Sequence, residues 1–331
     1  MLYYYALLYY NINLKQIKTM KKIHLISTLI GLLAFSTISK ADLKVVTSIK
    51  PIHSLASYIM DGVGSPGLIV DGYNSPHSFQ LKPSHAKMLE QADIIFWIGE
   101  DLENFLEKPL ATIAKKAEKI ELLEIKGIKK LKFRERNIFE EHEGHDDHRD
   151  DAKKEEHDNH DDHGHGEYDP HIWLDPINAK VILNEITEHL IENDSKNAAT
   201  YKSNLAKAKS EIDKLIIDVI TETNTDLSYV VFHDAYQYYE NRFNVNILGA
   251  MTVNPDVMPG AEQIHEIHEV IEHDNVSCIL SEPQFNPDII KSIAKDTSVK
   301  TGVLDPLGAN LKPGKDLYFD LIRNMSASFN C

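Results

Sequence analysis

The sequence predicts an α/β protein built from two (βα)4 lobes with parallel sheets, joined by one long rigid helix. Short runs rich in β-branched and aromatic residues alternate with helical patterns from residue 43, stop near residue 124 and start again at residue 229. Between the two series, residues 198–219 carry apolar side chains at helical spacing without Gly or Pro. Strands alternating with helices form parallel sheets, and ligands bind at the carboxyl ends of such strands. The cleft between the lobes is therefore the expected place for a binding site.

The first lobe is expected to cover residues 42–194. It opens with the run LKVVTS and contains IIFWI, an apolar run typical of a buried strand. The expected strands are residues 43–48, 67–70, 94–98 and 119–123. The expected helices are residues 52–60, 84–91 and 102–117.

A linker helix is expected within residues 195–224. Its apolar positions are spaced by three and four in turn, which places them on one face of a helix of about six turns. They are Ala198, Tyr201, Leu205, Ala208, Ile212, Leu215 and Val219. Such a length is unusual inside one βα unit and more natural as a brace between two lobes.

The second lobe is expected to cover residues 225–331, with the same alternation. The expected strands are residues 229–232, 245–250, 276–281 and 299–304. The expected helices are residues 236–242, 261–273, 287–295 and 317–329.

The N-terminal segment reads as an export signal. Residues 20–41, MKKIHLISTLIGLLAFSTISKA, have a positive start, an apolar stretch and a small-x-small end, so we expect cleavage after Ala41. The alternative, a membrane anchor, would need roughly 20 apolar residues, and this run has only about 16. No Cys lies near the junction, so we expect a periplasmic protein without a lipid anchor. Residues 1–19 are explained by a start codon placed too early or by a genuine extension.

Composition limits the function classes. The chain has 331 residues, 35 basic and 51 acidic side chains, a formal charge of −16 and 42% hydrophobic residues. This is enough apolar material for a core, so disorder throughout and a disulfide-stapled miniprotein are both excluded. The acidic balance argues against a nucleic-acid partner, because a phosphate backbone needs a basic face. Cationic ligands are the first expectation.

A histidine-rich tract, residues 140–169, accounts for most of the charge. It holds 14 acidic and 3 basic side chains, a net charge of −11, and 7 of the 17 His. Its Gly content and charge density oppose one rigid cage, so we expect a flexible collector with several weak metal sites. A solvated charged loop is the alternative. The expected auxiliary metal residues are His142, His145, His148, His157, His160, His163 and His165.

Four other residues form a candidate structured site. His77 follows the second expected strand, His171 lies in a Pro- and Trp-flanked segment after the tract, and His233 and Asp305 each directly follow a strand of the second lobe. Three neutral imidazoles with a carboxylate or water match the ligands and tetrahedral geometry of Zn²⁺. Singly, a His at a strand end is more often hydrogen bonded or solvent facing. Only the shared position in a cleft favours a metal site.

Cys278 and Cys331 are the only thiols. In an exported chain they are expected to pair, and closing a loop of about 54 residues would stabilise the fold by about 4 kcal/mol. Two free thiols are the alternative.

Four ordered motifs carry a resemblance to a known family. They are GYNSPHSFQLKPS at 72–84, PHIWLDP at 170–176, VFHDAYQY at 231–238 and LDPLG at 304–308, and TVNP at 252–255 and SEPQF at 281–285 agree with them. Through these motifs residues 43–331 resemble the metal-binding substrate-binding proteins of ABC importers, most closely those for zinc uptake. The resemblance implies a monomeric periplasmic receptor, not an enzyme, that captures Zn²⁺ as cargo and delivers it to an ABC permease in the membrane. A periplasmic zinc chaperone is a further candidate partner.

The resemblance also implies roles for single residues. It assigns the metal to His77, His171 and His233, and it points to zinc because manganese-type relatives place a Glu where His233 stands. Asp305 matches an acidic position of the family and is either the fourth ligand or a carboxylate orienting an imidazole, in which case a water or a loop residue completes the site. The family ties its C-terminal residue to an earlier Cys, as Cys331 and Cys278 would be tied. It also implies little hinge bending between the lobes.

Two other functions compete with that of a receptor. A secreted zinc hydrolase would need an open metal position and a general base. Its nearest motif, QIHEIHE at 263–269, fails the His-Glu-x-x-His pattern, and His265 and His268 are expected to be exposed. A periplasmic zinc buffer or interaction module, with the tract as its working part, is the third interpretation.

Overall fold

The computed structural model describes residues 42–134, 138, 166–253, 255, 259–297 and 299–331. The expected signal segment and the seven auxiliary histidines lie outside these residues. Residues 43–331 form one compact unit. Among the described helices, none combines the length and apolar character needed to cross a membrane.

The first sheet has four parallel strands in the order β2-β1-β3-β4. These strands are β1 (Val45–Ile49), β2 (Gly67–Val70), β3 (Ile94–Trp97) and β4 (Glu118–Glu121). The helices are α2 (Lys50–Ile59), α3 (Pro83–Gln91) and α4 (Glu100–Thr112). The α4 helix ends five residues before its predicted end. Its last turn opens into irregular hydrogen bonds, such as the one from Ala114 N–H to the Pro109 carbonyl.

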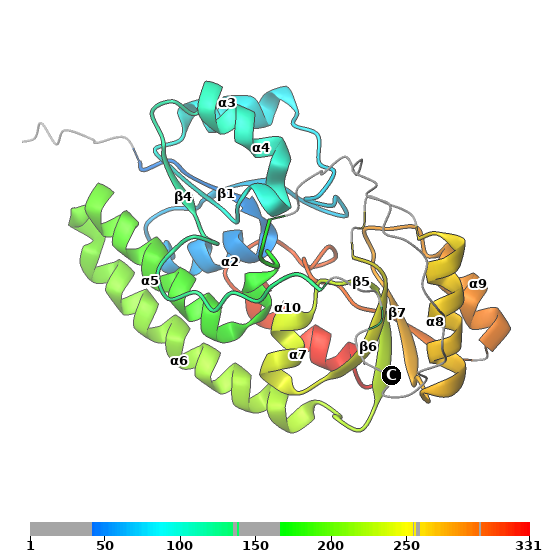
Figure 1. The fold of residues 1–331 in the computed structure, drawn as a ribbon. Helices are drawn as coiled ribbons and strands as arrows, with labels where there is room; N and C mark the ends of the chain where they lie inside the picture. The colour runs from blue at the N-terminus through cyan, green and yellow to red at the C-terminus, as the bar shows by residue number, and fades with distance from the viewer. Residues whose placement is uncertain (1–41, 135–137, 139–165, 254, 256–258, 298) are drawn as a thin grey trace, which may run out of the picture. The chain divides into compact units, whose positions relative to one another are not determined.

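The second sheet repeats this topology in the order β6-β5-β7-β8, again all parallel. Its strands are β5 (Ser228–His233), β6 (Asn246–Thr252), β7 (Cys278–Ser281) and β8 (Lys300–Val303). Its helices are α7 (Gln237–Phe243), α8 (Ala261–His273), α9 (Asp288–Thr297) and α10 (Leu317–Ser328). The predicted α/β class with two four-stranded parallel sheets is therefore confirmed (Figure 1).

Two long helices connect the sheets. The predicted long helix is α6 (Ala198–Glu222), and it packs against α5, α2 and α10. The helix α5 (Pro176–Asn193) has no counterpart among the predicted elements, although Asp175 caps it by accepting a hydrogen bond from Ile177 N–H and Pro176 begins it. Figure 1 shows α5 and α6 running side by side. The boundaries 42–194, 195–224 and 225–331 stay a prediction.

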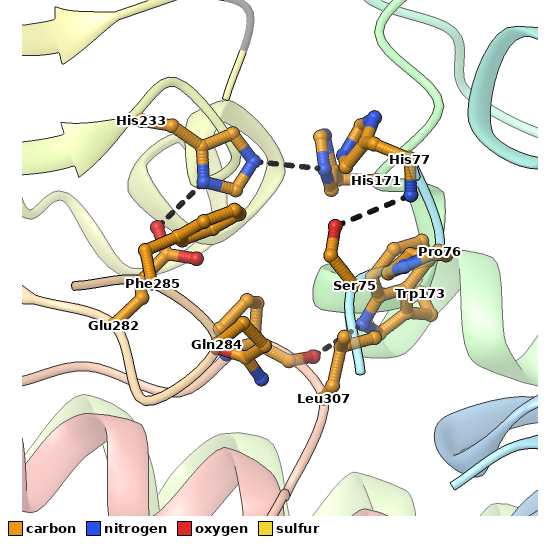
Figure 2. A pocket seen from close by; sticks show the side chains of 11 residues that line it. Ser75, Pro76, His77, His171, Trp173, His233, Glu282, Gln284, Phe285 and Leu307 are labelled. Atoms are coloured by element: carbon orange, nitrogen blue, oxygen red, sulfur yellow. Dashed lines mark hydrogen bonds and ion pairs between the residues drawn. The ribbon is translucent and has the colours of Figure 1, made fainter. Parts of the chain in front are cut away.

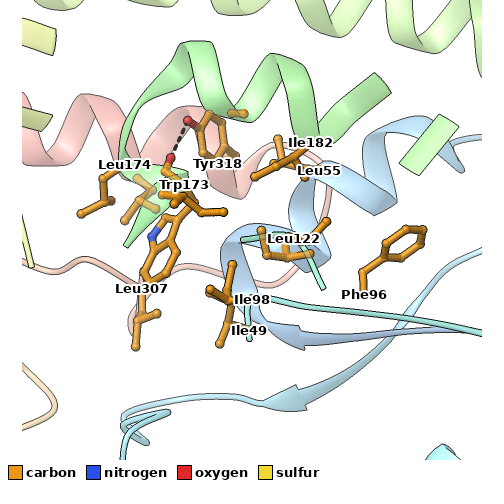
Figure 3. Packing of buried hydrophobic residues seen from close by; sticks show 14 of the residues in the cluster. Ile49, Leu55, Phe96, Ile98, Leu122, Trp173, Leu174, Ile182, Leu307 and Tyr318 are labelled. Carbon is orange, nitrogen blue, oxygen red and sulfur yellow. Dashed lines mark hydrogen bonds between the residues drawn. The ribbon is translucent and has the colours of Figure 1, made fainter. Parts of the chain in front are cut away.

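One hydrophobic core is shared by both sheets. It joins residues of β1 and β3 to α5, α6 and α10 and to the alternate β5 residues Tyr229 and Val231. Figure 3 shows its centre, where the Tyr318 hydroxyl of α10 donates a hydrogen bond to the Trp173 carbonyl. The intervening β5 residues, Val230 and Phe232, face a smaller core under α8 and α9, as the two-residue period of a strand requires.

Two further contacts tie distant segments together. Cys278, the first residue of β7, forms a disulfide with Cys331, which confirms the expected pair. The buried ammonium of Lys50 donates hydrogen bonds to the carbonyls of Ala309 and Leu311, so the start of α2 is held against the loop that follows β8.

Candidate metal centre

Three histidines from separate segments meet between the two sheets. One ring nitrogen from each of His77, His171 and His233 lies within 4.8 Å of the others. The ring centroids are 5.2 Å apart for His171 and His233 and 5.6 Å for the two pairs that include His77. Figure 2 shows the rings converging on one point.

Each histidine is positioned by its own element. His233 ends β5 and continues the face of Tyr229 and Val231 that looks into the shared core. His171 is buried immediately before a short 3-10 helix, Ile172–Leu174. Trp173 anchors this turn, because its indole N–H donates to the Pro306 carbonyl at 2.8 Å. His77 is half-buried in the loop after β2, and its backbone N–H donates to the Ser75 hydroxyl at 3.2 Å.

Two buried carboxylates fix the imidazoles. His171 Nδ1 lies 2.7 Å from Asp169 Oδ1, and His233 Nδ1 lies 2.6 Å from Glu282 Oε1. Both Nε2 atoms are thereby left facing each other, 3.4 Å apart. Two nitrogens bound to one tetrahedral Zn²⁺ would be about 3.3 Å apart, given metal–nitrogen bonds of roughly 2.0–2.1 Å. The donor set and its spacing therefore fit a single borderline divalent ion.

The surroundings set the protonation of the ligands. Burial lowers the pKa of His171 well below its usual value, and the neighbouring His233 adds to this effect. Burial raises the pKa of Asp169 to about 7. At His233 burial also opposes the charged form, but the carboxylates of Glu282, Asp234 and Asp169 together outweigh it and raise the pKa. A metal ion at this point would therefore compete with a proton at His233, whereas His171 is already neutral and available as a ligand.

The cavity at the histidines is small. It has a volume of about 10 Å³ and is lined by the three histidines, Glu282 and Trp173 among others. That is room for roughly one water-sized species. A larger hollow of about 850 Å³ shares Ser75, Gln284 and Phe285 with it, but none of the three histidines lines this hollow.

Asp305 lies apart from the group of converging nitrogens. Its Oδ1 accepts hydrogen bonds from Leu307 N–H, Gly308 N–H and the Gln284 amide, each at 3.0 Å. Its Oδ2 accepts one from Ala309 N–H at 2.5 Å. Both oxygens are thus engaged in holding the loop after β8.

Sequence reasoning missed the two orienting carboxylates. Asp169 is the last residue of the predicted histidine-rich tract, although its position two residues before His171 allows a local contact. Glu282 directly follows β7, the neighbour of β5 in the sheet, so its position at the same carboxyl edge as His233 was available as a signal. The exposed His265 stays on α8, where it contacts Glu269 rather than the candidate site.

The described residues 132–134 and 166–169, on either side of residues 135–165, lie near the site. Lys132 and Tyr168 form an antiparallel bridge between these two segments. Arg134 forms ion pairs with Asp234, the neighbour of His233, at 3.0 Å and with Glu240 at 2.6 Å.

Comparison with known proteins decides the family. Residues 45–330 match the family model described as ZnuA, zinc-uptake complex component A periplasmic. The chain belongs to the ZnuA family. It is 44% identical over 299 residues to the high-affinity zinc uptake system protein ZnuA of Brucella abortus (strain 2308), covering 86% of this chain and 90% of that protein. It is 36% identical to the Yersinia pestis protein of the same name, with coverage of 90% and 94%.

Solved structures agree on the ZnuA-type fold. A crystal structure of ZnuA superposes with a TM-score of 0.69 at 21% identity, covering 87% of this chain and all of the other. A mutant of the laminin-binding adhesin Lmb from Streptococcus agalactiae gives a TM-score of 0.69 at 23% identity, with coverage of 87% and 98%. At these identities the likeness concerns the fold alone.

Proposed function

We propose that this ZnuA-family chain is a periplasmic receptor that captures Zn²⁺ and delivers it to the permease of an ABC zinc importer. The observation that carries the proposal is the convergence of three imidazole nitrogens, within 4.8 Å of one another, in a cavity of about 10 Å³. The relatives are named for zinc uptake, which gives the ion and the transport step. We further propose export by cleavage after Ala41 without a lipid anchor, action as a monomer, and a periplasmic zinc chaperone as a second candidate partner.

His77, His171 and His233 would hold the ion through one nitrogen each, with a water in the fourth position. Asp169 and Glu282 would keep two rings in the tautomer that presents Nε2 to the metal, as carboxylates commonly do behind metal-bound histidines. Asp305 would shape the loop after β8 instead of binding the ion, because its oxygens already accept four hydrogen bonds.

A receptor accounts for this site better than a hydrolase. A hydrolytic enzyme must place an organic substrate against its metal, and the cavity at the histidines has room for little more than an ion. The larger hollow is lined by none of these histidines. A zinc buffer built on the tract would not need the three buried or half-buried histidines.

Substitution tests the assignment of the ligands. His77→Ala, His171→Ala or His233→Ala should each abolish tight zinc binding in a competition titration, whereas deletion of residues 140–167 should keep the tight site and lower the total zinc bound. His265→Ala, an exposed histidine of α8, is the matched control and should change neither quantity. Loss of tight binding on deletion of the tract would show that the assignment is wrong. Slower zinc-limited import in cells carrying the Ala variants would separate the receptor from a buffer.

A further inference from the structure

A second group of metal-ligating side chains lies at the other end of the first lobe. Glu118 begins β4, and His189 and Glu192 lie near the end of α5, and one ligand atom from each is within 4.8 Å of the others. The helix α5 has 18 residues and is therefore about 27 Å long. His171 precedes its first residue, so the two groups are too far apart to share one ion.

The orientation of the His189 ring is fixed by a third glutamate. Glu185 lies one helical turn earlier, and its Oε1 is 3.2 Å from His189 Nε2, within hydrogen-bonding geometry. With the proton on Nε2, the lone pair is left on Nδ1. A carboxylate behind one ring nitrogen with the other nitrogen directed at neighbouring ligands is the arrangement found around metal-bound histidines. The ring also packs edge-on against Phe96 of β3.

The contact between His189 and Glu118 lacks a proton in a suitable place. Nδ1 of His189 is buried and lies 2.8 Å from Glu118 Oε1, yet it makes no hydrogen bond of acceptable geometry. The Glu118 side chain is not free to turn away, because the Asn193 amide donates to its Oε2 at 3.0 Å. A nitrogen lone pair and a carboxylate oxygen at this distance repel each other unless a cation lies beside both.

The negative charge around His189 also favours a bound cation. Glu118, Glu185 and Glu192 bring three carboxylates around one imidazole. In the described part of the chain, no Lys or Arg forms an ion pair with any of them. One imidazole nitrogen and two carboxylate oxygens are ligands that Zn²⁺ and similar borderline divalent ions accept.

We propose that Glu118, His189 and Glu192 form a second, weaker site for a divalent metal ion of the zinc class, oriented by Glu185. The bound ion joins the edge strand β4 to the end of α5. Its affinity is lower than that of the three-histidine cluster, because only one of its ligands is an imidazole and Glu192 is exposed to solvent. The competing arrangement is a protonated His189 that forms ion pairs with Glu118 and Glu185 and binds no metal.

The test is NMR of the full mature chain with labelled histidines, in which the His189 ring signal is the one lost in His189→Asn. Zinc added beyond saturation of the three-histidine cluster should shift or broaden this signal. Glu192→Gln should raise the zinc concentration needed for half of the change by about tenfold or more, because loss of a charged ligand costs at least as much as loss of a carboxylate that only orients one. Glu188→Gln, an exposed neighbour on the same helix, is the matched control and should leave the response unchanged.

A His189 signal that follows pH but does not respond to zinc would overturn the proposal and support the ion-paired imidazolium. An equal zinc response in Glu192→Gln and Glu188→Gln would also overturn it. Anomalous scattering from zinc-soaked crystals of the unchanged chain provides a second measurement that needs no variant. It should give a peak among Glu118, His189 and Glu192 with metal–ligand distances of roughly 2.0–2.2 Å, and an empty map there, beside a peak at the three histidines, counts against the site.

Discussion

The zinc affinity of the candidate metal centre should depend on Asp169 and Glu282, which orient the rings, as well as on the histidines themselves. Glu282 keeps Nδ1 of His233 occupied, so that Nε2 faces His171. We expect Glu282→Gln to weaken zinc binding by about 10- to 100-fold, because the amide no longer fixes the tautomer or adds to the basicity of the ring. Competition titration against a chelator of known affinity measures this change.

Asp288→Asn is the control for Glu282→Gln, since Asp288 is an exposed carboxylate at the start of α9. It should leave zinc affinity unchanged. An unaltered affinity in Glu282→Gln as well would mean that the burial of His233, and not its carboxylate partner, fixes the ring.

Asp305, in contrast, is a carboxylate that we expect to stabilise the fold without binding zinc. Asp305→Asn weakens or removes hydrogen bonds that three backbone N–H groups donate to one carboxylate. We expect the free energy of unfolding to fall by about 1–3 kcal/mol, while one tight zinc equivalent per chain is retained. Chemical denaturation and zinc titration of the same sample measure both quantities. Loss of the tight equivalent from a variant of unchanged stability would make Asp305 the fourth ligand.

At the residue scale, the sequence was sufficient to choose the three histidines that meet. His77 and His233 come after strands, His171 lies in a segment flanked by Pro and Trp, and all three fall in the motifs that carry the family resemblance. It was not sufficient for Asp169 and Glu282. Their role depends on which nitrogen of each ring faces the centre. For His171 this depends on the side-chain conformation of a local contact with Asp169, and for His233 on Glu282, which is 49 residues away in the sequence.

At the scale of single elements, the disulfide should make a large contribution to stability. Cys278 and Cys331 are separated by 53 positions, and the bond ties β7 to the end of the chain after α10. Replacing both by Ser should lower the free energy of unfolding by about 4 kcal/mol in the chain-entropy model. Thermal and denaturant unfolding of the double variant measure the loss, and the unchanged chain in reductant should behave alike.

Zinc affinity serves as the control in that experiment, because neither Cys belongs to the group of histidines. A double variant as stable as the unchanged chain would mean that the packing of α10 against α6 and α2 already holds the C-terminus in place.

The strands were predictable to within two residues, because β-branched and aromatic runs bounded by turns identify them. The helix α5 was not predicted, although it is the second longest in the fold. It lies directly after the charged tract, and its apolar residues cover both the side facing α2 and the side facing α6, so one amphipathic face does not stand out. The capping signal at Asp175 and Pro176 was the local evidence for its start.

At the scale of the whole molecule, pH should control the release of the ion. The pKa of His233 is raised above its usual value of 6.5, so protons compete with metal at this ring from a higher pH than at an ordinary histidine. Apparent zinc affinity should therefore fall as pH decreases, by about tenfold per pH unit for each imidazole that has become protonated. Titrations between about pH 5.5 and pH 8 measure this dependence.

Glu282→Gln gives the matched comparison for the pH series. Without the carboxylate the pKa of His233 should drop, so the decline in zinc affinity should begin at a lower pH, from an affinity that is already weaker. A decline that starts at the same pH in both proteins would place the controlling proton on another group.

The core common to both sheets limits the ways in which an ion can leave. Two halves that share one core cannot separate by a hinge motion without exposing Trp173, Tyr318 and their neighbours to water. His77 is the least buried of the three histidines and lies in the loop after β2. We therefore expect the ion to be exchanged through movement of the loop that carries His77. A partner that binds this loop would release the ion without separating the two sheets.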